Sequence, residues 1–152
     1  MNAPVVRQAV LSDLEPLAVL FDRYRQFQRQ DSDIAAARVF LRDRLNYGQA
    51  ALFIAVDGVS PVGFAQLYPS FSSVSLSRVF VLNDLFVDES GRRKGIASLL
   101  LSAVEAYAWA LGASRVTLNV AKDNPTAQQL YEARGWQPDQ QFNMYHRFPP
   151  RQ

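Results

Sequence analysis

The sequence predicts an α/β fold in which a mixed, mostly antiparallel central sheet carries helices on both faces. Three observations support this prediction. The 152 residues suffice for one ordinary domain. Strand-like and helix-like periodicities alternate along the chain, and a strand–helix–strand unit follows a run of hairpin-forming strands. Because such a unit joins parallel strands whereas hairpins join antiparallel ones, we expect a mixed sheet in a single domain spanning residues 1–152.

The expected elements, in chain order, are a strand at 5–10, helices at 12–28 and 31–45, strands at 51–56, 62–71 and 77–87, a helix at 94–112, a strand at 114–120, a helix at 124–135 and a strand at 142–148. The first strand has the character of an edge. In the first helix, Ser12 and Glu15 stand at capping-box spacing before apolar residues at helical intervals. The second helix begins after Ser32 or Asp33 as its N-cap.

Turn and stop signals place the remaining elements. Asp57 and Gly58 mark the turn of a hairpin between two apolar strands. The long third helix ends at Gly112, and the last helix runs from Asn124 to Gly135. In the tail, the alternating pattern FNMYHRF predicts a final strand.

Composition limits the possible functions. The chain has no cysteine and one histidine, His146, which argues against thiolate catalysis, disulfides and metal sites, so we expect no metal. A net charge of +2 is too small for a general nucleic-acid binder. Since the sequence shows no membrane-spanning run and no secretory signal at its start, we expect a cytoplasmic protein.

A basic segment, RRKGIA, precedes the long third helix. A helix N-terminus presents unpaired N–H groups and a positive partial charge, and the small residues Gly95 and Ala97 would let a phosphate approach them. Neither a Walker loop nor a dinucleotide-binding glycine motif is present. From this segment alone, an anion site and a solvated charge run remain equal alternatives.

Three motifs together resemble the Gcn5-related N-acetyltransferase (GNAT) superfamily. RRKGIA is similar to its pyrophosphate loop, with Ala97 in place of a commoner glycine, while NDLFV and NPTAQQLYEARGW fall where that family has its coenzyme strand and catalytic helix. The resemblance is close from Arg78 to Phe148. The combination of the three motifs is similar to a narrower branch that includes polyamine, histone-lysine and D-amino-acid acetyltransferases.

The resemblance implies a GNAT-like fold and acetyl transfer from acetyl-coenzyme A to an amine by direct attack in a ternary complex. It makes Tyr131 the acid for the leaving thiolate; the alternative is a packing role. Asp84 would accept a proton through water or hold the substrate's ammonium, unless it is paired with Arg78 or another arginine. Some polyamine acetyltransferases have a glutamate at the position of Asn83, so one candidate base is missing.

The resemblance also implies a coenzyme site. Backbone groups of the coenzyme strand would pair with pantetheine, and N–H groups of the basic loop would bind pyrophosphate. Asn124 would contact the pantetheine arm, although it also suits a helix N-cap. The expected coenzyme-binding residues are Leu85, Phe86, Val87, Arg92, Arg93, Lys94, Gly95, Ile96, Ala97, Asn124 and Ala127.

The acceptor would lie against the first two helices. Tyr24, Phe27, Asp31 and Asp33 form an aromatic and acidic set suited to a cationic amine, although Asp33 also suits a helix N-cap. Asn83 on the coenzyme strand is a further expected substrate-binding residue. The interleaved arginines favour an ordinary solvated face or attraction to a carboxylate. We expect a small-molecule amine as acceptor and a homodimer. The alternatives are a protein-lysine acetyltransferase and a non-catalytic acyl-coenzyme-A sensor.

Overall fold

A computed structural model describes residues 3–151 of the chain. The chain divides into two compact units, residues 1–119 and residues 120–152, which are described separately. Within the described residues, no helix is long and apolar enough to cross a membrane.

The first unit contains a five-stranded sheet in the order β1-β2-β3-β4-β5. Neighbouring strands are antiparallel except β4 and β5, which are parallel and joined through α3, as predicted. The elements are β1 Val5–Gln8, α1 Leu14–Phe27, α2 Ile34–Asn46, β2 Ala51–Asp57, β3 Ser60–Ser72, β4 Ser77–Val87, α3 Ile96–Ala110 and β5 Val116–Leu118, with short 3-10 turns at Leu11–Asp13 and Glu89–Gly91.

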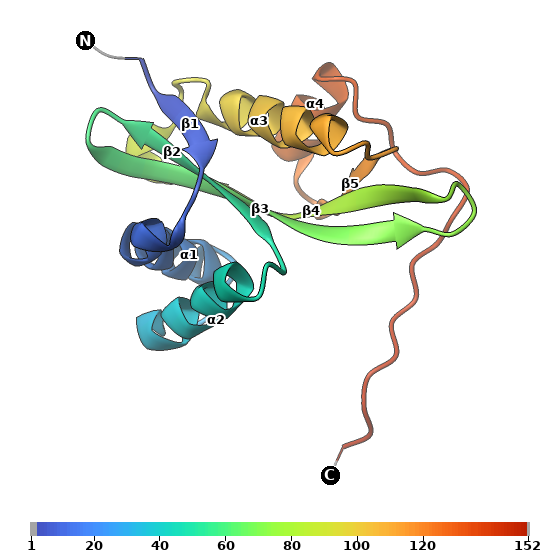
Figure 1. Cartoon of the computed structure of the whole chain (residues 1–152), viewed down its shortest axis with the longest axis horizontal. Helices are drawn as coiled ribbons and strands as arrows, with labels where there is room; N and C mark the ends of the chain where they lie inside the picture. Colours follow the sequence, from blue (N-terminus) through green and yellow to red (C-terminus); the bar gives the residue numbers. More distant parts are fainter. Residues whose placement is uncertain (1–2, 152) are drawn as a thin grey trace. The chain divides into compact units, whose positions relative to one another are not determined.

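Helices α1 and α2 cover one face of the sheet and α3 covers the other (Figure 1). The alternation of side chains along β3 produces this arrangement. Phe64 points toward α1, where its ring lies 5.8 Å from that of Phe21. The next position along the strand, Gly63, faces α3 and lies against Ile96 and Leu100. The predicted layers of helix, sheet and helix are therefore confirmed.

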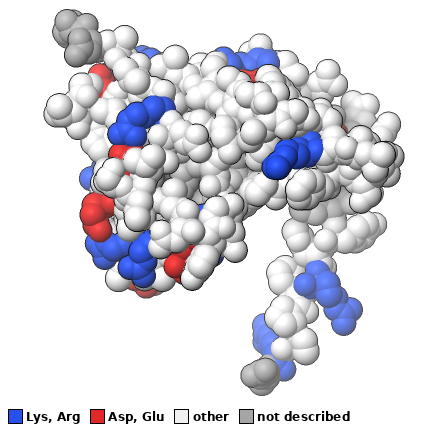
Figure 2. All heavy atoms as spheres, viewed as in Figure 1, with Lys and Arg blue, Asp and Glu red and all other residues white. Residues whose placement is uncertain are grey.

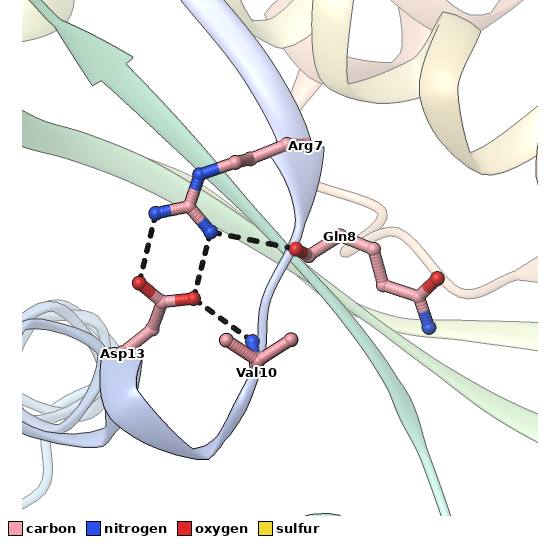
Figure 3. Close-up of polar contacts among 4 residues, drawn as sticks. All are labelled: Arg7, Gln8, Val10 and Asp13. Carbon is pink, nitrogen blue, oxygen red and sulfur yellow. Dashed lines mark hydrogen bonds and ion pairs between the residues drawn. The ribbon is translucent and has the colours of Figure 1, made fainter.

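The start of α1 differs from the prediction. Asp13, rather than a capping box of Ser12 and Glu15, organises this turn (Figure 3). Its carboxylate accepts the backbone N–H of Val10 at 2.8 Å and a two-pronged contact from Arg7 at 2.8 and 2.9 Å. The carboxylate thereby joins the edge strand to the first helix.

The second helix begins as predicted. Asp33 is its N-cap and accepts the backbone N–H of Ala36 at 3.1 Å. On its surface, Arg38 donates to both oxygens of Glu15 at 2.7 and 3.0 Å, which explains why Glu15 is not a capping residue.

The second unit contains α4, Pro125–Ala133, and a tail. The helix was predicted, but the strand expected at 142–148 is absent: those residues form no strand, and side chains such as Phe142 and Tyr145 are 77% and 89% exposed. An alternating pattern forms a strand only where a neighbouring strand accepts and donates its backbone hydrogen bonds. The described tail has no such pairing.

Candidate functional site

The two edges of β4 are used differently. Along one edge, residues 85–87 pair with residues 63–65 of β3. Along the other edge, β5 pairs only with Phe80, Val81 and Leu82. A bulge places Asn83 outside the register between these two stretches. Beyond it, the predicted pantetheine strand Leu85–Val87 has an edge without a strand partner in the described chain, as strand-like pairing with a ligand would require.

The turn that leads into α3 offers free donors. Among residues 3–151, no hydrogen-bond acceptor is found for the backbone N–H groups of residues 93–98. Gly95 is the N-cap of α3 and has a left-handed φ of 72°. Ile96 is 2% exposed, so its side chain anchors the helix start while its N–H stays unpaired. An anion would meet several N–H groups and the positive end of the helix.

The cationic side chains of this loop are placed differently from one another. Lys94 pairs with Asp57 at 2.7 Å, so its charge is used within the protein. Arg92 donates its Nε to the carbonyl of Val87 at 3.4 Å. Arg93 has no side-chain partner within the described residues and has a positive φ of 65°. Of the three, only Lys94 pairs with a carboxylate in the described chain, so Arg92 and Arg93 both remain for an anionic ligand.

Asp84 lies on the α1/α2 face of the sheet and is only 6% exposed. Its carboxylate accepts Nε2 of Gln66 at 2.7 Å and Nδ2 of Asn83 at 3.1 and 3.2 Å. In the described chain it forms no ion pair, so the expected alternative of a pair with Arg78 is wrong. A buried carboxylate held by neutral amides is suited to a cationic ligand or to a proton.

Aromatic rings from α1 lie beside this strand. The Tyr24 ring packs 5.8 Å from Phe86, and the Phe27 ring lies 6.2 Å from Phe86 and 6.0 Å from the Arg92 guanidinium. Tyr24 is largely part of the core, whereas Phe27 is 64% exposed. Asp31 is exposed in the loop between α1 and α2 and has no described contact that places it with the others.

The loop between α1 and α2 is held by a residue that the sequence did not single out. Asp22 is 6% exposed and accepts Ser32 Oγ at 2.7 Å, the Asp33 N–H at 2.8 Å and Gln26 Nε2 at 3.0 Å. The hydrogen bond from Ser32 is the largest factor that lowers the pKa of Asp22, so this anchor is a carboxylate at neutral pH.

Within the second unit, Asn124 and Tyr131 belong to α4 and its cap. Asn124 is the N-cap and accepts the backbone N–H of Ala127 at 3.2 Å, as expected for its alternative role as a helix cap. Tyr131 is half-buried, with its ring 5.9 Å from that of Trp136. Burial raises the pKa of Tyr131 above its ordinary value of 10.0, so the hydroxyl remains protonated at neutral pH.

Charges on the visible face form no single large patch of one sign. Figure 2 shows Lys and Arg side chains next to Asp and Glu on the left of the view, whereas the charges visible elsewhere are fewer and mostly Lys and Arg. Several arginines face carboxylates, as in the pairs Arg7–Asp13 and Arg23–Asp88. No group of three or more His, Cys, Asp or Glu residues that could hold a metal ion occurs among the described residues.

Known proteins resemble this chain in sequence and in fold. The Acetyltransferase (GNAT) family matches residues 14–136. Uncharacterized N-acetyltransferase YhfO of Bacillus subtilis (strain 168) is 44% identical over 140 residues, 92% of this chain and 94% of that protein. A crystal structure of a probable acetyltransferase has a TM-score of 0.91 and 37% identity, covering 97% of this chain and 99% of that one. L-ornithine N5-acetyltransferase NATA1 of Arabidopsis thaliana is 36% identical over 98 residues, 64% of this chain and 38% of that protein.

Proposed function

Because the chain belongs to the GNAT family of acetyltransferases, we propose that it transfers an acetyl group from acetyl-coenzyme A to a primary amine of a small molecule. Polyamines, amino acids and similar compounds are the acceptor class. The reaction is direct attack in a ternary complex, without a covalent enzyme intermediate. The observation that carries this proposal is the row of unpaired N–H groups at residues 93–98, beside the free edge of β4.

These residues suit the coenzyme. Backbone N–H groups of residues 93–98 would hold the pyrophosphate, Arg93 would add a charged contact, and Leu85–Val87 would pair with pantetheine. A glycine suits position 95 because its backbone is left-handed, not because space is short: an added Cβ would meet nothing within 4 Å. Asn124 Oδ1 already caps α4, so its proposed contact with the pantetheine arm would use its Nδ2.

The chemistry needs a proton acceptor and a proton donor. The nitrogen–carbon bond forms as the carbon–sulfur bond of the thioester breaks, so the amine loses a proton and the thiolate gains one. We assign Asp84 to the amine side, as a base through water or as the seat of the ammonium. We assign Tyr131 to the thiolate side, and its raised pKa supports a protonated donor.

The name of the ornithine N5-acetyltransferase, one of the relatives above, supports a small amine as the acceptor class. A homodimer, a cytoplasmic location and a single domain over residues 1–152 are further parts of this proposal. Light scattering tests the assembly: a monomer at micromolar concentration would count against the dimer.

Release of free thiol from acetyl-coenzyme A, measured across polyamines, amino acids, aminoglycosides and lysine peptides, tests the function. The expected result is amine-dependent thiol release that falls by about 100-fold or more in Tyr131→Phe. Tight coenzyme binding without thiol release would identify a sensor instead. Release only with lysine peptides would identify a protein acetyltransferase.

A further inference from the structure

Asp84 is a buried charge without an opposite charge. Its hydrogen-bond donors, Gln66 and Asn83, are neutral amides, and no lysine or arginine pairs with it in the described chain. Removing a carboxylate from water is costly unless a cation compensates. An ammonium group that binds beside Asp84 would supply this compensation.

Gln66 points to a ligand that donates hydrogen bonds. Its side chain is fully buried, and because a carboxylate only accepts, its NH₂ group must face Asp84. This fixes the orientation of the amide and leaves Oε1 buried, with no partner among the described residues. An ammonium has three N–H donors, enough for Asp84 and Gln66 together.

Arg44 on α2 is the converse case, a cationic side chain that has no carboxylate partner in the described chain. Its guanidinium lies 4.5 Å from the centre of the Phe40 ring, and its Nε donates to Gln49 Oε1 at 3.0 Å. It is half-buried, and within residues 3–151 it forms no ion pair with a carboxylate. Its orientation is therefore set by neutral groups, which leaves the two terminal nitrogens for a carboxylate.

Both groups lie on the same side of the sheet. Gln66 and Tyr68 are two residues apart on β3 and project toward α1 and α2. Gln49, the partner of Arg44, stands two residues before Ala51, which pairs with the neighbour of Tyr68. The end of α2 thus lies at the Tyr68 end of this face.

The charges of Asp84 and Arg44 both act on Tyr68, which projects from the same face of β3 as Gln66. Burial raises its pKa most, the charge of Asp84 raises it further, and the charge of Arg44 opposes the rise. Gln66 and Tyr68 are about 6–7 Å apart along the strand, since each residue advances about 3.3 Å. A ligand that reaches from Gln66 to the Tyr68 end of this face must therefore be longer than the span between the α-amine and the carboxylate of an amino acid. An amine at the end of a side chain provides that length.

We infer that the acceptor is a free amino acid with a primary amine at the end of its side chain, the amine at Asp84 and Gln66 and the carboxylate at Arg44. The inference rests on the proposed function and narrows its acceptor class. The acetyl group is transferred to the side-chain nitrogen, which loses a proton, while the coenzyme leaves as the thiol. Arg44 acts as a specificity residue that never touches the reacting atoms.

The test compares acceptors that differ in the carboxylate: ornithine with putrescine, lysine with cadaverine, and lysine with lysine amide. We expect the wild-type kcat/KM to be about tenfold or more higher for each amino acid than for its partner, since a charge-assisted arginine contact is among the strong hydrogen bonds. Arg44→Met should remove that difference through a higher KM, with putrescine turnover and acetyl-coenzyme-A affinity unchanged. Arg42→Met, an exposed arginine on the same helix, should leave the ratio intact.

Equal or better use of diamines by the wild-type enzyme overturns the inference, and so does an equal loss for both acceptor types in Arg44→Met. In these cases the proposed function stands, because amines are still acetylated. Absence of thiol release with every amine tested overturns the proposed function and this inference with it. The wild-type ratios decide the question even if Arg44→Met does not fold.

Discussion

Replacing Gly95 by alanine separates backbone geometry from side-chain charge in coenzyme binding. Gly95 is the N-cap of α3 and Gly112 follows its end, with φ values of 72° and 78°. An added Cβ meets nothing within 4 Å at either site. The strain of a left-handed alanine is about 1–2 kcal/mol. Each kcal/mol lowers the melting temperature of a chain this size by about 2–4 °C. We therefore expect similar losses of stability in Gly95→Ala and Gly112→Ala.

Coenzyme affinity should distinguish the two variants. Alanine can relieve this strain by a change of φ, which at Gly95 would redirect the unpaired N–H groups that follow it, whereas Gly112 stands at the far end of α3. A lost charge-assisted hydrogen bond is worth about 1.5–3 kcal/mol, so the Kd for acetyl-coenzyme A should rise about tenfold or more in Gly95→Ala. Gly112→Ala should stay within about twofold, and Arg92→Ala or Arg93→Ala should each lose less than Gly95→Ala.

Isothermal titration calorimetry gives the Kd of each variant, and thermal unfolding without coenzyme gives the matched stability. Equal coenzyme binding by Gly95→Ala and Gly112→Ala would contradict a coenzyme site made of backbone N–H groups. Weaker binding by either arginine variant than by Gly95→Ala would also contradict it, since the side chains would then contribute more than the backbone.

Two further predictions follow from the pKa shifts. Because the pKa of Tyr131 is raised above 10.0, a Tyr131 acid stays protonated through neutral and mildly alkaline pH, and kcat measured against pH should lose activity on the basic side only above about pH 10. In Tyr131→Phe, kcat should be lower and its pH profile should lack the loss of activity on the basic side. The Kd for the coenzyme should stay within about twofold. The Arg7 hydrogen bond is the largest factor that depresses the pKa of Asp13, so its stabilisation is present above the ordinary value of 3.8 and is lost as pH falls through the lower, folded-state pKa. Asp13→Asn should lower the free energy of unfolding at pH 7 by about 1 kcal/mol, a modest figure because Arg7 is 51% exposed, and urea titrations at pH 7 and pH 3 should show this difference shrinking in acid.

Short sequence signals correctly predicted the helix ends that depend only on neighbouring residues. Asp33 caps α2 and Gly112 follows the end of α3, because a cap needs only the neighbouring backbone. The two incorrect predictions concern features that depend on residues far away in the sequence. Glu15 was expected in a capping box but pairs with an arginine of α2, and the alternating tail at 142–148 was expected to be a strand although it has no described strand partner.

The acceptor side of the site could not be predicted in the same way. Gln66 meets Asp84 only because β3 and β4 pair in one register, and Asn83 reaches that carboxylate from a bulge. Register depends on the whole sheet rather than on any single motif. A polar glutamine in the otherwise apolar run GFAQL was the available signal, since a polar residue on an inward face usually has a partner.

The basic loop shows how misleading charge alone can be in this chain. Lys94 is held by Asp57 on β2, and the side chain of Arg23 on α1 is held by Asp88 at the other end of the loop. These ion pairs fasten the loop to the strands and helix around it, so they orient the backbone between them. Within residues 3–151, the main-chain N–H groups of residues 93–98 have no acceptor, and Arg92 and Arg93 pair with no carboxylate. The charge of Lys94 therefore helps to position a binding surface made of backbone, and a glycine substitution tests that surface more directly than the loss of an arginine.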